Sequence, residues 1–357
     1  MMLNKDSLFF LLLRDALWRR NEPLPSELSE KEIEPLLSLT KKQAVSGLIS
    51  DSLIRNDVKL PQMRVFELVG LQECIKQNSR QINNGAKELH MLFERYHVKY
   101  VIVKGQVVAS YYPNPLLRQS GDVDFYCDSQ YFDNSLVAVR DSWNVNTETE
   151  DSEYHAHFDY KGVTFEGHFA LALFFNKRKD SYWQQILDSD RGAVVNVDGV
   201  DVRTLSPTLH VLFVYLHLFH HLVGLGVGFR QLCDWAVMLH YANSQINQEQ
   251  LQMHLKVLGM DSFYRACGSI LVDYLGLPET EFGYNISSKD RKYGKKILDI
   301  VFYRGNFGQY NKRNGFSGWK HQVEASFIKI SHFIKFVPLI PDYSFRWVWH
   351  EFKTKVI

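Results

Sequence analysis

Asp122 and Asp124 are the residues whose type and spacing best suit chemistry. They stand in the run Gly121-Asp122-Val123-Asp124-Phe125-Tyr126, whose β-branched and aromatic members predict a strand. Alternate side chains of a strand face the same way, so both carboxylates would lie on one face. Two carboxylates held together beside a glycine turn suit a divalent cation that carries phosphate oxygens.

A strand and a turn are expected just before this pair. The run from Val98 to Val103 is rich in β-branched and aromatic residues, which predicts a buried strand, and Lys104-Gly105-Gln106 follows it directly. A short helix is expected from Val107 to Tyr112, because Pro113 would stop it. The glycine would let the backbone approach a phosphate, and the N-terminus of the helix would favour anions.

These residues together resemble the signature of a known family. Lys104-Gly105, Tyr112-Pro113, Arg118 and Gly121-Asp122-Val123-Asp124 are similar to the motif of a bacterial group of uncharacterised nucleotidyltransferases in the polymerase-β-like superfamily. The resemblance implies an α+β fold, in which a polymerase-β-like core with a small mixed sheet is flanked by helical regions. One departure is Gly105-Gln106, where the superfamily usually has Gly-Gly or Gly-Ser.

The resemblance also implies a reaction. Asp122 and Asp124 would hold Mg²⁺, and a nucleoside monophosphate would pass from a nucleoside triphosphate to an acceptor hydroxyl or a similar group. ATP is the expected donor, and the acceptor would be a small molecule or a protein. The sequence does not name that acceptor.

A third carboxylate is expected from a later strand. The run 163–169 alternates so that Glu166 and His168 share a face. In the resembled group this strand tends to end with an acidic residue followed two positions later by histidine, which makes Glu166 the expected third metal ligand or general base. Asp159, on the partner strand, is the alternative. His168 would orient Glu166, contact the substrate's phosphate, or form a structural hydrogen bond.

The nucleotide is expected to bind just before the carboxylates. The residues predicted to hold it are Lys104, Gly105, Gln106, Arg118 and Gly121. Lys104 would offset the charge of the triphosphate, or else lie in solvent at the end of a strand. The planar fork of Arg118 would grip a phosphate or fix Asp124, unless it is an exposed loop residue.

A second group of polar residues lies farther along the chain. His217 and His221 are four residues apart, as are Arg230 and Asp234, and each pair would share a helix face. The pattern resembles the helical half of the same family, where it would face the cleft and contact substrate. The alternatives are a structural zinc site, buried hydrogen-bonded histidines, and an Arg230–Asp234 ion pair within one helix.

The composition of the chain limits which partners and which cell compartment are expected. The chain has 357 residues with 41 basic and 40 acidic side chains, so no overall field favours long nucleic acid as a partner. The four cysteines are far apart and form no metal-type pair, which favours a reducing, cytoplasmic compartment. The apolar run from Leu8 to Leu13 is too short to span a membrane, so no membrane partner is expected.

The spacing of apolar residues changes twice along the chain, from helical to strand-like and back to helical. It predicts an N-terminal helical region over residues 1–95, the nucleotidyltransferase core over 96–205, and a C-terminal helical region over 206–357. Within the first region, single helices are expected from Thr40 to Asn56 and from Gln62 to Tyr96.

Within the core, Lys161-Gly162 and Asp198-Gly199 lie between paired strand-like runs and predict tight hairpins. Other chemistries are disfavoured, because the chain lacks G-x-x-x-x-G-K-[ST], G-x-S-x-G and H-E-x-x-H motifs. Asp124 and Glu166 are also the types of a glycosidase pair, but the glycine turn favours phosphate.

Two other classes of function stay open. One is a nucleotide-binding or regulatory module that keeps the fold without turnover. The other is an interaction protein that uses its aromatic C-terminal tail, residues 327–352.

Overall fold

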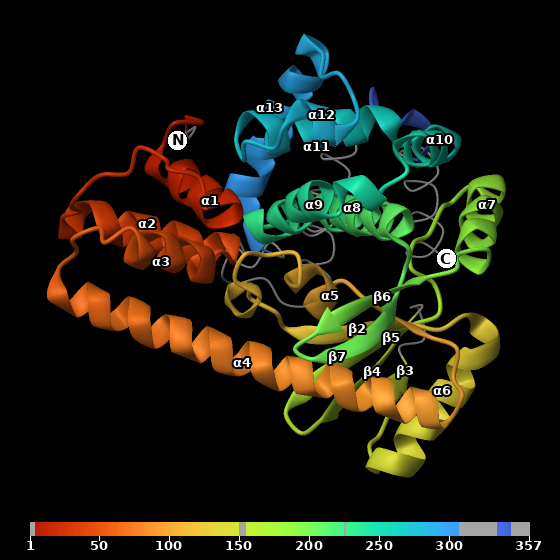
Figure 1. Cartoon of the computed structure of the whole chain (residues 1–357). Coiled ribbons are helices and arrows are strands. Elements are labelled where there is room, and N and C mark those ends of the chain that lie inside the picture. The colour runs from red at the N-terminus through yellow and green to blue at the C-terminus, as the bar shows by residue number, and fades with distance from the viewer. Residues whose placement is uncertain (1–3, 150–154, 225, 307–333, 344–357) are drawn as a thin grey trace, which may run out of the picture.

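The computed structural model describes residues 4–149, 155–224, 226–306 and 334–343. The fold is α+β. A small mixed sheet lies below a layer of helices, and one long helix runs along its opposite side (Figure 1). The aromatic tail lies outside the described residues except for 334–343, where Phe336, Ile340 and Tyr343 are buried in the helical core.

Four helices precede the sheet. They are α1 (Leu8–Trp18), α2 (Glu30–Gln43), α3 (Ser46–Arg55) and α4 (Gln62–Arg95). The predicted long helix is confirmed as α4, but the single helix expected from Thr40 to Asn56 is wrong, because the chain breaks at Ala44 with a φ of 55°. The reason is tertiary. The buried amide of Gln43 donates to the Val301 carbonyl at 3.3 Å and accepts from the Phe229 N–H at 3.1 Å.

The main sheet has the strand order β1-β2-β5-β4-β3. Its strands are β1 (Val101–Val103), β2 (Asp122–Tyr126), β3 (Glu148–Thr149), β4 (His155–Tyr160) and β5 (Val163–His168). Among the neighbouring strands of this sheet in the described ranges, β2 and β5 are parallel and the other pairs are antiparallel. The expected strand from Val98 is shorter than predicted, because the Val98 N–H instead closes the end of α4 on the Phe93 carbonyl at 2.9 Å.

Both predicted hairpins are confirmed. β4 and β5 turn at Lys161-Gly162, with φ of 49° and 73°. A separate hairpin, β6 (Ala193–Val197) and β7 (Val200–Thr204), turns at Asp198-Gly199, with φ of 48° and 88°. Positive φ at both central residues is what the tight turn between right-twisted strands requires.

Short elements connect the strands. They are α5 (Gly105–Ala109), the 3₁₀ turn η1 (Pro115–Leu117), α6 (Ser129–Trp143) and α7 (Lys177–Asp188). The helix expected from Val107 to Tyr112 is shifted, because α5 begins at Gly105 and ends at Ala109. Five residues make little more than one turn, so its N-terminus is a weaker anion site than predicted.

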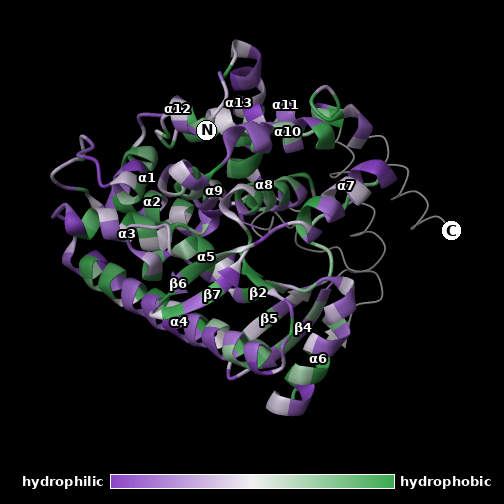
Figure 2. Cartoon of the chain, turned by 45° about the vertical axis from the view of Figure 1, so that its right-hand side comes forward, coloured by the Kyte–Doolittle hydropathy of each residue, from purple (hydrophilic) through white to green (hydrophobic). Residues whose placement is uncertain are grey.

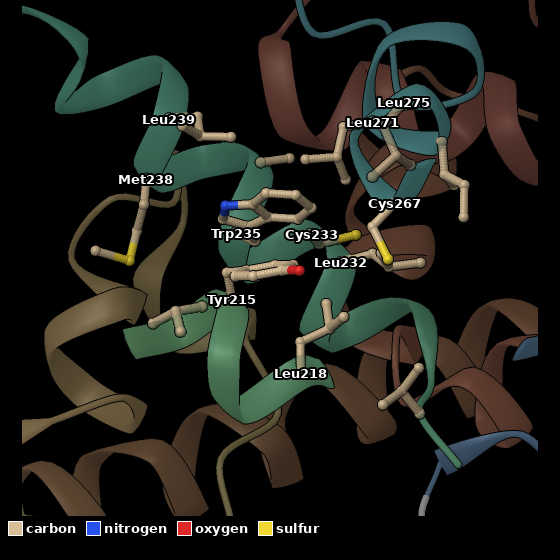
Figure 3. Packing of buried hydrophobic residues seen from close by; sticks show 14 of the residues in the cluster. Tyr215, Leu218, Leu232, Cys233, Trp235, Met238, Leu239, Cys267, Leu271 and Leu275 are labelled. Atoms are coloured by element: carbon tan, nitrogen blue, oxygen red, sulfur yellow. The ribbon is translucent and has the colours of Figure 1, made fainter. Parts of the chain in front are cut away.

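The last helices form the upper layer. They are α8 (Pro207–Gly224), α9 (Phe229–Tyr241), α10 (Gln248–Leu258), α11 (Asp261–Asp273), α12 (Glu279–Phe282) and α13 (Ser288–Arg304), with a 3₁₀ turn η2 (Asn243–Gln245). Figure 3 shows Trp235 of α9 packed between Tyr215 of α8 and residues of α11 such as Leu271. The Tyr215 and Trp235 rings lie 5.3 Å apart.

The first and last helices share one core. The Phe9 ring of α1 lies 5.4 Å from Phe229 and 5.9 Å from Phe302, in edge-on contacts. The hydrophobic residues of α8 belong to the same core and lie in the middle of the molecule, between the sheet and the outer helices (Figure 2). None of the helices in the described ranges combines the length and apolar character that crossing a bilayer demands.

The two faces of the sheet have opposite characters. One face carries Val123, Phe125, Phe158 and Phe165, which pack on α4 and α6 in a second core. α4 comes close because it has Gly85 there: a Cβ at this position would lie 3.0 Å from Val163 and 3.1 Å from the Phe165 ring. The other face carries the acidic residues and lies below α8 and α9.

Candidate active site

The sheet register brings the three predicted carboxylates together. Asp124 of β2 is the direct neighbour of Glu166 of β5, and Asp122 is the neighbour of Thr164. One oxygen from each of Asp122, Asp124 and Glu166 lies within 4.8 Å of the others. Parallel pairing places these side chains on the same face, because both strands keep the same two-residue period. Asp159, the alternative, is exposed and accepts a hydrogen bond from the Thr164 hydroxyl at 2.6 Å.

The three carboxylates repel one another, and their surroundings shift their pKa values in opposite directions. The charge of Asp124, followed by burial, raises the pKa of Asp122 above its usual range. Burial and then the same Asp124 charge raise the pKa of Glu166. Asp124 itself is only 3% exposed, and burial opposes its ionisation, but Lys104 and His168 hold its pKa below the ordinary value. Three carboxylates share this small volume with Lys104, which leaves the group rich in negative charge.

Lys104 extends over the carboxylates rather than into solvent. Its Nζ lies 2.5 Å from Asp124 Oδ1, and burial opposes its charge while the three carboxylates raise its pKa. Its backbone has φ 54° and ψ −137°, a conformation that residues with a Cβ rarely adopt. Strained residues of this kind gather at functional sites. The conformation is held by its N–H, which donates to Nε2 of the buried His210 at 3.2 Å.

His168 also contacts Asp124. Its Nε2 donates to Asp124 Oδ1 at 3.0 Å, so it supports the deepest carboxylate. Of the roles considered for His168, the structure therefore shows the hydrogen bond to a carboxylate, on Asp124 rather than Glu166. The Nε2 of His168 lies 3.8 Å from the Glu166 oxygen, which is too long for a hydrogen bond.

A cavity of about 340 Å³ opens over the carboxylates. Its floor is the sheet face with the carboxylates and Lys104, and its roof comes from α8 and α9. The predicted residues that line it are Lys104, Gly105, Arg118, Asp122, Asp124, Glu166, His217, His221, Arg230 and Asp234. Residues more than 100 positions apart thus meet at one site, as the resemblance implied.

Three predicted residues are not part of the cavity lining: His168, whose contact with Asp124 is described above, and Gln106 and Gly121. Gln106 is 3% exposed, and both atoms of its side-chain amide lack a hydrogen-bond partner among the described residues. Gly121 lies in the exposed loop just before β2, and a Cβ there would meet nothing within 4 Å. Neither Gln106 nor Gly121 is placed where it would contact a ligand inside the cavity.

Arg118 lines the cavity, but its contacts differ from two of the alternatives drawn from the sequence. It is buried, and its Nε and Nη2 donate to the two oxygens of Asp234 at 2.7 and 2.8 Å. Tyr112 donates to the same carboxylate at 2.7 Å, and Arg118 Nη1 donates to Ser120 at 2.7 Å. Arg118 therefore holds Asp234 instead of Asp124, and it is no exposed loop residue. The ion pair expected between Arg230 and Asp234 is replaced by this one, while Arg230 donates to the Gln119 carbonyl at 2.6 Å.

The paired histidines of α8 lie in the roof of the cavity. The His217 and His221 rings are 4.3 Å apart, and burial, followed by the charge of Lys104, lowers the pKa of His221 to about 3. The same two causes lower the pKa of His217 well below its usual value. Both rings are therefore neutral. Neither belongs to the groups of potential metal ligands that converge in the described part of the chain, which argues against the zinc alternative.

Comparison with known proteins identifies the family. The family model described as "Uncharacterised nucleotidyltransferase" matches residues 29–276, more than two thirds of the chain. The protein belongs to this nucleotidyltransferase family. A search of the curated proteins found no match. An antigenic nucleotidyltransferase-like protein from Paracoccidioides brasiliensis is similar at 15% identity and a TM-score of 0.33, over 56% of this chain and 92% of that one.

The family match covers both the motif and the cavity. The family match runs from α2 into the turn after α11, so it includes both the sheet and the two helices of the cavity roof. The resemblance that was carried by a short motif is thus confirmed at the level of the family and of the α+β fold.

Sequence reasoning missed two histidines near the site. His155 of β4 lies opposite His168, with its Nε2 3.7 Å from a Glu166 oxygen. The alternation that placed Glu166 would have placed His155 on the same face, because both belong to one hairpin. His210, which holds the backbone of Lys104, gave no such signal, since 106 positions separate the two residues.

Proposed function

We propose that this nucleotidyltransferase moves a nucleoside monophosphate from a nucleoside triphosphate to an acceptor hydroxyl in a metal-dependent reaction. The observation that carries the proposal is the convergence of Asp122, Asp124 and Glu166 on the floor of a cavity, with Lys104 above them. Buried carboxylates that repel one another are costly unless a cation offsets them. Three carboxylates that repel one another would not stabilise the fold, so a purely structural role does not explain their convergence.

The donor set fits a hard divalent cation. Carboxylate oxygens are the ligands that Mg²⁺ and Mn²⁺ take, and a clear excess of negative charge remains after Lys104 is counted. Asp122 and Asp124 would hold the ion, and Glu166 would complete the set or take the proton of the acceptor. Such an ion supplies charge stabilisation to the transferring phosphoryl group and the leaving pyrophosphate.

The chain's own residues position the substrates. Lys104 would turn from Asp124 toward the triphosphate and offset part of its charge, and Gly105 would let the backbone approach it. The raised pKa of Glu166 suits a group that accepts a proton from a hydroxyl. The acceptor would enter below α8 and α9, where Arg230 and the neutral His217 and His221 can donate or accept hydrogen bonds.

Arg118 and Asp234 take a different part in this proposal. Their hydrogen bonds are already made within the protein, so they brace the cavity wall instead of binding substrate. The cavity of about 340 Å³ is at the small end of ligand sites, so it suits the triphosphate and the reacting end of the acceptor rather than a long polymer. The free cysteines favour the cytoplasm, where nucleoside triphosphates are available.

One experiment tests both halves of the proposal. Titration calorimetry would measure binding of nonhydrolysable ATP, GTP, CTP and UTP analogues with and without Mg²⁺, and pyrophosphate release would be followed with candidate acceptors. Asp122→Asn should lower the affinity for the analogues in the presence of Mg²⁺ by at least about tenfold. Asp159→Asn is the matched control, because it removes an exposed carboxylate from the same sheet face. An Asp122→Asn protein that still released pyrophosphate at the wild-type rate would sink the proposal.

A silent nucleotide-binding module is the second candidate, and Lys104 is the observation that favours it. Its ammonium already pairs with Asp124, so it can supply part of the charge that a cation would otherwise bring. Such a module would bind the analogues equally well without Mg²⁺ and release no pyrophosphate. The same titration therefore separates the two candidates.

A further inference from the structure

The sheet face beside the carboxylates carries a group of histidines that the proposed transfer does not use. His155 and His168 are direct cross-strand neighbours on β4 and β5, and Glu166 lies two residues before His168 on the same face. The Nε2 atoms of both histidines point to the same Glu166 oxygen, at 3.7 Å from His155 and 3.8 Å from His168. One ligand atom from each of the three residues lies within 4.8 Å of the others.

The distances between these nitrogen and oxygen atoms match those expected between ligand atoms bound to one metal ion. They exceed the range of a hydrogen bond, which ends near about 3.2 Å for nitrogen and oxygen. Ligands about 2.1 Å from a tetrahedral metal lie about 3.4 Å from one another, as the geometry of zinc sites requires. The observed 3.7 and 3.8 Å are close to that edge length.

A fourth ligand is at hand. Asp124 Oδ1 lies 3.0 Å from His168 Nε2, the same nitrogen that lies 3.8 Å from the Glu166 oxygen. The Nε2 proton that now joins His168 to Asp124 would leave when an ion binds, since a ligating imidazole nitrogen is unprotonated. The side chains of His155, His168 and Glu166 are 18%, 12% and 21% exposed, so an ion could enter and keep a position open to solvent.

The donor chemistry differs from that of the neighbouring carboxylate group. Two imidazoles and a carboxylate suit Zn²⁺, Co²⁺, Fe²⁺ or Mn²⁺, whereas Mg²⁺ prefers oxygen ligands. We propose that His155, His168 and Glu166 form a second metal site, for a first-row transition ion, which shares Glu166 and its fourth ligand, Asp124, with the all-carboxylate site. The two sites would hold two different metal ions next to each other on one face of the sheet.

The shared carboxylate gives the pair a purpose. A bridging Glu166 would hold the two ions at a fixed separation, which is the arrangement used to stabilise both the attacking and the leaving oxygen of a displacement. The binding of the transition ion itself does not depend on the proposed transfer. Occupancy of the histidine site is measurable with neither nucleotide nor acceptor present.

Co²⁺ is the probe for the test, because its visible absorption reports both binding and coordination geometry. The purified full-length protein would be stripped with chelator, supplied with excess Mg²⁺ to fill the carboxylate site, and titrated with Co²⁺. We expect one Co²⁺ per chain with strong absorption typical of a site with nitrogen ligands and few water molecules. Zn²⁺ should displace it, and added Mg²⁺ should not.

Variants separate this site from its neighbour. His155→Ala should weaken Co²⁺ binding by at least about 100-fold, because the loss of a direct ligand costs no less than the loss of an outer-shell partner. His157→Ala is the matched control, since it removes an imidazole from the same face of β4, 4.5 Å from the His155 ring, and should bind Co²⁺ as the wild type does. Asp122→Asn should also keep the Co²⁺ site, because Asp122 belongs only to the other group.

The result that would overturn the proposal is Co²⁺ binding unchanged in both His155→Ala and His168→Ala, or lost to the same degree in Asp122→Asn. Far-UV circular dichroism of the chelated variants checks that each is folded, and His155→Gln keeps a polar side chain should alanine disturb β4. Failure of nucleotide transfer with an intact Co²⁺ site would contradict the proposed function alone. Transfer without Co²⁺ binding would contradict this inference alone.

Discussion

Two charged groups line one cavity, and they differ in how completely their charges are balanced. Arg118 and Asp234 form a complete pair, in which two parallel hydrogen bonds of 2.7 and 2.8 Å are supplemented by Tyr112. Asp122, Asp124 and Glu166 share one close lysine and a histidine hydrogen bond. The first group has satisfied its donors and acceptors within the chain. The second has not.

The difference separates structure from function. A buried pair that is fully hydrogen-bonded rigidifies its surroundings and offers little to a ligand. A group with excess charge is destabilised until a counter-ion arrives, so it keeps affinity for one. The balanced pair joins the loop before β2 to α9, and it thereby fixes the distance between the floor and the roof of the cavity.

The strongest test of this comparison is a change that separates activity from stability. Asp122→Asn should lower nucleotidyl transfer on the order of 10³-fold or more, about 4 kcal/mol of transition-state stabilisation. It should not lower the free energy of unfolding in chelator, because the charge of Asp122 is disfavoured by its neighbour Asp124. Steady-state kinetics and urea unfolding measure the two effects. A variant that lost both equally would show that the carboxylates are structural.

The balanced pair should behave in the opposite way. Arg118→Met leaves the buried carboxylate of Asp234 without its partner, and the free energy of unfolding should fall by about 3 kcal/mol. The double variant Arg118→Met/Asp234→Leu should recover most of that loss, because no uncompensated charge remains. Urea unfolding of both variants measures this. If the double variant were folded and stable but bound nucleotide at least tenfold more weakly, Arg118 would be a substrate ligand after all.

A buried group that stays neutral sharpens the comparison. Burial lowers the pKa of His210 to about 3, and its Nε2 accepts the Lys104 N–H, so a proton there would face another donor. Below the unfolded pKa of about 6.5 the unfolded chain binds a proton that the folded chain does not. Stability therefore falls as the pH falls, by about 2 kcal/mol from this residue alone between pH 7 and pH 5.

The measurement compares urea unfolding of the wild type and of His210→Asn at several pH values. The wild type should lose more stability on acidification than the variant, by about that amount. Equal slopes for the two proteins would contradict a neutral, buried His210. Other buried histidines contribute to both slopes, so only the difference is informative.

The smallest effect concerns the loop that carries Arg118. Gly47 of α3 packs against that loop, and a Cβ there would collide with the Leu117 carbonyl. Gly47→Ala should lower the free energy of unfolding by about 1 kcal/mol and weaken the Arg118–Asp234 pair. Gly70→Ala is the matched control, because a Cβ at this helical position meets nothing within 4 Å and should stabilise the protein slightly. Thermal unfolding of both variants decides it, and equal melting temperatures would contradict the close approach.

Much of the architecture followed from local pattern. The two hairpins were predicted from Lys161-Gly162 and Asp198-Gly199, because those dipeptides favour the φ values that the turns adopt. The sharing of a face by Asp122 and Asp124 followed from strand alternation. The continuous pattern across residues 40–56 misled, because periodicity alone did not reveal that Gln43 is held by groups almost two hundred and more than two hundred and fifty positions away.

Local alternation sets which side chains share a face of the sheet, and long-range packing sets which residues lie opposite them. Alternation placed Glu166 with His168, but only the register of β2 against β5 set Glu166 beside Asp124. Arg118 and Asp234 are 116 positions apart, and no local pattern connects them. The physical reason is that periodicity reports a residue's direction from its own backbone, whereas a partner is chosen by long-range packing, desolvation and charge, which act only once the chain has folded.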